Sequence, residues 1–112
     1  MHKKRKKTTK ELRLELVAFS KIAYERELQF ELSKLQGKFA QWEVQKISSV
    51  ELNEEIHRYH NDISRELWIK YRSSTFHDLI VARAIFEGIV SCEELSKKLL
   101  NLLEPKVNAF KT

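Results

Sequence analysis

The chain has 112 residues, of which 42% are hydrophobic and 33% charged, and this composition excludes a disordered chain. With only two Gly and one Pro, it lacks the turn residues that β-sandwiches and barrels need. No apolar run approaches the roughly 18 residues of a membrane span. The length fits one domain of ordinary size.

The net charge of +5 comes from the first ten residues. Of the 21 Lys and Arg, six lie there with no acid, which leaves 15 against 16 Asp and Glu in the rest of the chain. We expect residues 1–8 to form a disordered basic tail that contacts phosphates, an anionic surface or an acidic partner, or that only aids solubility. The candidate nucleic-acid contacts are Lys3, Lys4, Arg5, Lys6, Lys7 and Lys10.

The cellular location is predicted from the cysteine content and the N-terminus. Cys92 is the only cysteine, so no internal disulfide can form, and this fits a reducing cytoplasm. The basic start is not followed by the apolar stretch that a signal peptide requires.

A long amphipathic helix is predicted over residues 9–47. Thr8 and Glu11 have capping-box spacing at its start, and no strong stop appears before Ile47. Gly37 is its one weak point, so the segment is either a single helix or a helical hairpin that bends there.

This segment has apolar residues on two opposite sides. One stripe holds Leu12, Leu16, Phe19, Ala23 and Phe30, and the other holds Leu14, Val17, Tyr24, Leu28, Leu32, Leu35, Phe39 and Trp42. A helix that is apolar on two sides must be covered on both, one by the rest of this chain and one by a second copy or another protein. The predicted partner-binding residues are Leu28, Leu32, Leu35, Phe39 and Trp42.

Residues 48–104 are predicted to form a compact part of three shorter helices. Capping boxes at Ser48–Glu51 and Ser91–Glu94 open the first and the last, and Thr75 with Asp78 is a plausible cap for the middle one.

The ends of these helices and their core follow from residue type. Gly88 suits the position just after the middle helix, over about residues 76–87, and Pro105 is expected to end the last one, leaving 105–112 as a C-terminal tail. The predicted core is Leu52, Ile56, Ile63, Leu67, Leu79, Ile85, Phe86, Leu95 and Leu99.

One weak metal candidate lies on the first of these helices. Glu54, His57 and His60 are spaced by three, as in helical metal sites, but the further ligands that such sites need are missing. The preferred interpretation is a packing ridge beside the apolar face, formed by Asn53, His57, His60, Ser64, Trp68 and Tyr71. We therefore expect no metal, no cofactor and no catalytic residue.

Together these patterns predict an all-α fold, in which a long N-terminal helix, or helical hairpin, packs with three shorter helices as a small bundle. The expected function is a non-enzymatic cytoplasmic module for protein–protein interaction or regulation, which pairs through the long helix with itself, for example as a homodimer, or with another protein. The alternative is a nucleic-acid-associated protein that contacts phosphates through the basic tail.

Overall fold

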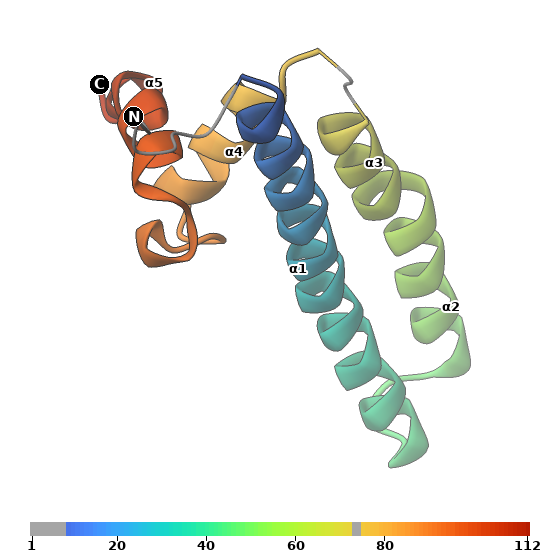
Figure 1. The fold of residues 1–112 in the computed structure, drawn as a ribbon. Helices are drawn as coiled ribbons and strands as arrows, with labels where there is room; N and C mark the ends of the chain where they lie inside the picture. Colours follow the sequence, from blue (N-terminus) through green and yellow to red (C-terminus); the bar gives the residue numbers. More distant parts are fainter. Residues whose placement is uncertain (1–8, 73–74) are drawn as a thin grey trace, which may run out of the picture. The chain divides into compact units, whose positions relative to one another are not determined.

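The computed structural model describes residues 9–72 and 75–112 and confirms the all-α fold (Figure 1). No strand occurs in this part of the chain. None of its helices is long and apolar enough to cross a membrane. The elements are α1 (Thr9–Glu43), α2 (Ser49–Arg58), the π-helix η1 (Tyr59–Ser64), α3 (Arg65–Tyr71), α4 (His77–Phe86), the 3-10 helix η2 (Cys92–Glu94) and α5 (Lys97–Phe110).

The long segment is one continuous helix. It passes through Gly37 without a break, so the hairpin alternative is wrong. It ends at Glu43, a few residues before the predicted stop, because Gln45 adopts a left-handed conformation with φ 61°. The N–H of Gln45 donates to the carbonyl of Trp42 (2.9 Å) and the N–H of Lys46 to that of Gln41 (2.8 Å), which is a Schellman cap. Thr8, the predicted N-cap, lies outside the described residues.

The chain divides into two compact units, and α1 contributes to both. The hairpin unit contains residues 24–72, and the terminal unit contains residues 9–23 and 75–112.

In the hairpin unit, α2, η1 and α3 run back antiparallel to α1 (Figure 1). The predicted Ser48–Glu51 capping box is confirmed, and it starts α2 directly after the turn. The indole Nε1 of Trp42 donates to Ser49 Oγ at 2.9 Å across the turn. At the other end, the rings of Tyr24 and Tyr71 lie 5.3 Å apart. The antiparallel register is thus fixed at both ends.

The π-helix has a reason in the sequence. Tyr59, Ile63, Leu67 and Tyr71 follow each other in steps of four, and a 3.6-residue helix would carry these side chains progressively round its axis. A π-turn contains more residues than an α-turn and so takes up the excess. All four side chains are consequently buried or half-buried in the hairpin.

The terminal unit contains most of the buried apolar side chains. They are Ala23, Ile80, Val81, Ala82, Ala84, Val90, Leu95, Leu99 and Leu103. Its main polar anchor joins α1 to the start of α5. Both carboxylate oxygens of Glu15 accept hydrogen bonds from Ser96, the N-cap of α5, one from its N–H and one from its Oγ, each at 2.8 Å. A carboxylate is favoured at this place because helix N-termini carry a partial positive charge.

Three predictions about helix ends are corrected. Pro105 lies inside α5 and does not end it, so residues 105–110 are helical. After the proline, the Phe110 ring stacks on Phe86 at 5.9 Å and Lys106 pairs with Asp78 at 3.6 Å, and these contacts offset the hydrogen bond that a proline removes. The Ser91–Glu94 box is present but starts η2, while Ser96 caps α5. The cap residue of α4 is Phe76, which makes no side-chain cap bond.

The predicted core is correct for some residues and wrong for others. Leu52, Leu67, Leu95 and Leu99 are buried and Ile63 and Ile85 are half-buried, as expected. Ile56, Leu79 and Phe86 are exposed instead. The physical reason is that a helix in a two-layer arrangement touches its neighbours along part of its circumference only, so an apolar residue at the edge of the contact face stays accessible.

The caps of α1 and α4 give a matched pair of stability predictions. Both are Schellman caps, but Gly88 occupies the left-handed position after α4 with φ 79°, whereas α1 has Gln45 there. We expect Gln45→Gly to raise the free energy of unfolding by about 1 kcal/mol and Gly88→Ala to lower it by a similar amount, because a Cβ is disfavoured at positive φ. Urea unfolding followed by circular dichroism measures both changes, and an unchanged or lowered stability for Gln45→Gly would contradict the assignment.

Candidate interaction surface

The five predicted partner-binding residues all lie on the α1 segment of the hairpin unit, but not in equivalent positions. Leu28 and Leu35 are half-buried, whereas Leu32, Phe39 and Trp42 are exposed. The stripe is therefore divided. Part of it belongs to the α1 surface that packs inside the hairpin, and part remains accessible along the edge of that surface.

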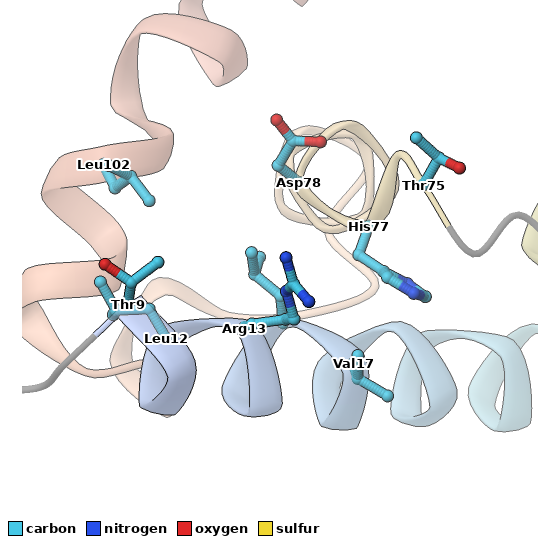
Figure 2. Close-up of a pocket in the computed structure, with 9 residues that line it drawn as sticks. Thr9, Leu12, Arg13, Val17, Thr75, His77, Asp78 and Leu102 are labelled. Atoms are coloured by element: carbon cyan, nitrogen blue, oxygen red, sulfur yellow. The ribbon is translucent and has the colours of Figure 1, made fainter.

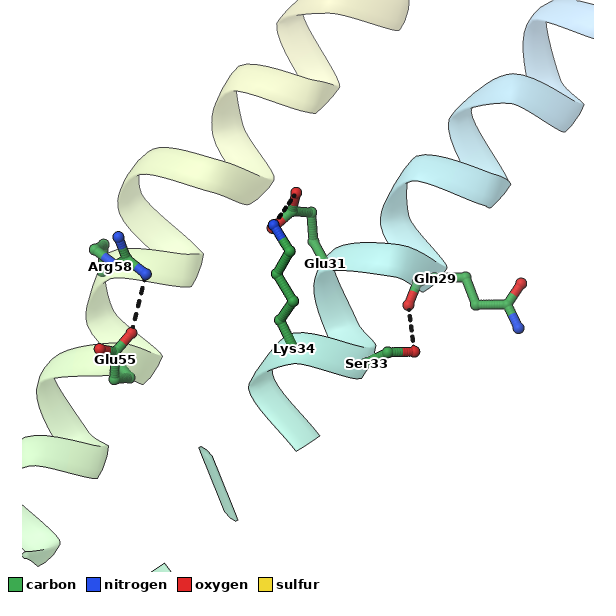
Figure 3. Close-up of polar contacts among 6 residues, drawn as sticks. All are labelled: Gln29, Glu31, Ser33, Lys34, Glu55 and Arg58. Carbon is green, nitrogen blue, oxygen red and sulfur yellow. Dashed lines mark hydrogen bonds and ion pairs between the residues drawn. The ribbon is translucent and has the colours of Figure 1, made fainter. Parts of the chain in front are cut away.

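One side of the hairpin is a charged groove of about 560 Å³ between α1 and α2–η1. Its rim consists of Glu31, Lys34 and Lys38 from α1 and of Glu55 and Arg58 from α2, with Leu35, Tyr59 and Ile63 also in its lining. Lys34 pairs with Glu31 at 3.4 Å and Arg58 with Glu55 at 3.1 Å, each within its own helix (Figure 3). Each pair joins an exposed base to a half-buried acid three residues away on the same helix, and such pairs contribute little to stability.

The side opposite the charged groove is apolar. Three charged rim residues are followed directly by exposed apolar ones, in Glu31–Leu32, Lys38–Phe39 and Glu55–Ile56, whereas the residues after Lys34 and Arg58 line the groove. One residue later in a helix means a rotation of about 100°, and in two antiparallel helices this rotation leads towards the same side of the pair. Leu32, Phe39 and Ile56 therefore turn away from the groove to a common surface, which we call the apolar side.

The two helices of the hairpin are held together by a partly buried carboxylate. Glu27 of α1 accepts a hydrogen bond from Lys70 Nζ at 2.9 Å and another from the Tyr71 hydroxyl, both on α3. The side chains of Glu27 and Lys70 are each only 21% exposed. Hydrogen bonds to charged groups are stronger when water is excluded, so this cluster fixes the distance and register of the two helices.

The weak metal candidate is not assembled. Glu54, His57 and His60 are all exposed, and His60 lies in η1, where the π-helical turn changes the angular spacing from α2. In the described ranges, no three His, Cys, Asp or Glu side chains lie close enough to hold a metal ion.

The candidate nucleic-acid residues fall almost entirely outside the described part of the chain. Lys3, Lys4, Arg5, Lys6 and Lys7 belong to residues 1–8, and Lys10 is exposed in the first turn of α1.

A second hollow, of about 590 Å³, lies in the terminal unit between α1, α4 and α5 (Figure 2). Its walls are partly apolar, with Leu12, Leu16 and Leu102, and the Arg13 guanidinium projects into it. The Asp78 carboxylate accepts from the Leu79 N–H at 2.9 Å and pairs with Lys106. Nδ1 of His77 is buried and has no hydrogen-bond partner among the described residues, and because it is inaccessible it does not serve the open hollow.

The chain was compared with protein-family models, with curated proteins and with solved structures, and none of the three comparisons gave a match.

The sequence patterns did not indicate α2 and α3 as parts of the candidate surface. Ile56 was assigned to the core, and Trp68 was read only as a member of a packing ridge, yet both are exposed, Trp68 at 53%. The missed signal is the order of residue types along the chain. Trp68 comes directly after Leu67, which faces α1, so a rotation of about 100° brings it to the side on which Leu32 lies.

The Glu27 cluster generates a prediction about stability. We expect Glu27→Ala to lower the free energy of unfolding by about 1–3 kcal/mol, because partly buried donors on Lys70 and Tyr71 lose a charged acceptor. Glu31→Ala is the matched control on the same helix, with an expected change within about 0.5 kcal/mol because its partner Lys34 is 59% exposed and lies three residues away on the same helix. Urea unfolding at one fixed protein concentration compares the two variants, and equal losses would contradict the role of Glu27 as an anchor.

Proposed function

We propose that this chain is a small helical protein–protein interaction module that acts without catalysis and self-associates through the α1 segment of its hairpin unit. The observation that carries the proposal is the exposure of large apolar side chains in one stripe of α1. Leu32 is 47% exposed, Phe39 39% and Trp42 40%. Aligned apolar side chains on a soluble helix are typical of contact surfaces.

The size of the hairpin unit supports the same proposal. Its fully buried apolar side chains are few, namely Leu52, Leu67 and Tyr71. Units of this size rarely bury enough apolar surface alone and are commonly completed by association. A contact that covers the exposed stripe would therefore supply stability as well as recognition.

A cytoplasmic location is part of the proposal. Cys92 is the only cysteine, and it is free and exposed in η2. An exposed thiol of this kind persists best in a reducing compartment.

Self-association can be tested on the full chain with one variant and one matched control. Leu32→Glu places a charge in the stripe, and Phe30→Glu places the same charge two residues earlier, on the opposite side of the helix, at a residue that is 62% exposed. We expect the wild-type protein to associate reversibly, Leu32→Glu to weaken association at least about tenfold, and Phe30→Glu to leave it nearly unchanged. Sedimentation equilibrium over a wide concentration range measures all three.

Two outcomes would contradict the proposal. The first is a wild-type chain that stays monomeric at every concentration. The second is an equal loss of association in Leu32→Glu and Phe30→Glu, because a general effect of added charge would then explain it.

A further inference from the structure

We infer that two copies of this chain pack the apolar sides of their hairpin units against each other about a twofold axis, forming a four-helix bundle. The inference rests on the proposed self-association and adds to it that α2, η1 and α3 take part in the interface together with α1. The first observation behind it is the distribution of charge in α2, η1 and α3, residues 49–71, which form the return half of the hairpin.

Along this return half, the residues before and after each α1-facing position differ in charge. The residues that face α1 are Leu52, Tyr59, Ile63, Leu67 and Tyr71, which are all buried or half-buried. The residue before each of them is charged, and these are Glu51, Arg58, Asp62, Glu66 and Lys70. The residues after the first four are Asn53, His60, Ser64 and Trp68, none of them an acid, a lysine or an arginine, whereas Tyr71 is followed by Arg72, whose guanidinium lies 5.0 Å from the centre of the Trp68 ring.

The α1 half of the hairpin repeats this order. Leu28 and Leu35 are preceded by Glu27 and Lys34 and followed by the amides Gln29 and Gln36. By the same rotation as before, the amides turn to the apolar side and the charges to the groove. The apolar side is thus uncharged at its centre and carries charges towards its ends, at Glu25, Glu43 and Arg72, and depletion of charge is the compositional mark of the buried part of an interface.

A second copy fits this surface because the centre of the surface carries no charge of either sign. In a twofold dimer only residues near the axis meet their own equivalents, so a twofold axis through this centre brings no like charges together there. Stacking two hairpins face to face about a twofold axis also places each helix antiparallel to the helix that it faces, which is the arrangement of up-and-down four-helix bundles.

The remaining charges favour antiparallel neighbours as well. Residues 24–33 contain three acids and one base, and residues 34–43 contain one acid and two bases. Residues 49–58 again contain three acids and one base, and residues 59–72 contain two acids and three bases. Each arm of the hairpin is therefore acidic in its N-terminal half and basic in its C-terminal half. Antiparallel packing then sets acidic halves beside basic halves, both within one copy and between two copies.

The exposed apolar area is a large part of what a specific dimer needs. Leu32, Phe39, Ile56 and Trp68 are each about a third to a half exposed, which is roughly 400 Å² of apolar surface per copy. Two copies would cover about 800 Å² of this surface, and the polar residues at its edges add to the buried total, which in specific interfaces begins at about 1,200 Å².

The test uses the full chain and variants on α3, away from the long helix. Trp68→Ala removes an apolar-side residue, and Ile69→Ala removes its neighbour, which is similarly exposed (46%) but turned away from both sides. We expect Trp68→Ala to raise the dimer dissociation constant at least about tenfold and Ile69→Ala to change it less than about twofold. Sedimentation equilibrium gives the constants and the number of copies, and circular dichroism checks that each variant keeps the wild-type helix content.

A second matched pair adds charge without removing packing. Asn53→Lys places a lysine on the apolar side, and Asn61→Lys places one on the outer surface of the same run of helix, with both positions exposed in the single chain. We expect only Asn53→Lys to weaken the dimer, because the twofold brings the added charge into the interface from both copies.

The outcomes separate this inference from the proposed function. A monomeric wild-type chain would overturn both, and would leave the apolar side to a different protein. A second outcome is a dimer whose dissociation constant rises in Leu32→Glu but stays the same in Trp68→Ala, Ile69→Ala, Asn53→Lys and Asn61→Lys. This outcome would leave the proposed function standing and overturn the four-helix bundle in favour of contact through α1 alone. An assembly of more than two copies would also overturn the bundle.

Discussion

Two helices touch along one line, and this constraint governs the hairpin unit. Each helix can bury a single stripe against the other, so any apolar residue beyond that stripe stays accessible. In α1 the stripe is shared by Leu28 and Leu35, while Leu32 and Phe39 stand at its edge. The hairpin is thereby left with one apolar side and one charged side, and the interaction surface proposed for this protein follows from that asymmetry.

Polar anchors from α1 complement this sparse packing. In the hairpin unit the anchor is Glu27, which accepts from Lys70 and Tyr71, and in the terminal unit it is Glu15, which accepts two hydrogen bonds from Ser96. Apolar contacts are tolerant of small shifts, whereas charged hydrogen bonds are directional. These two glutamates therefore set the register of the elements that pack on each half of the same helix.

Much of the fold could be predicted because its signals are local. The Ser48–Glu51 box and Gly88 mark helix boundaries within a few residues of themselves, and both act as expected. Pro105 was misjudged because its cost is local but its compensation is not, since the Phe86–Phe110 stack joins residues far apart in the chain. The α1 part of the candidate surface could be predicted from the spacing of apolar residues in the sequence. The part contributed by Ile56 and Trp68 could not, because the exposure of these side chains depends on which face of α2 and α3 meets α1.

The sequence by itself determined the helical class, the length of α1 to within a few residues and the presence of more apolar surface than one helix contact can cover, because composition, caps and periodicity act over a few turns. The tertiary structure decided how that surface is divided. It turned the steps of four from Tyr59 to Tyr71 into a π-helix, joined charged edges of two helices into one groove and left exposed apolar side chains of both helices on the opposite side. The physical reason is that a side chain's exposure depends on the angle at which its helix meets the neighbour, and that angle exists only once the helices have packed.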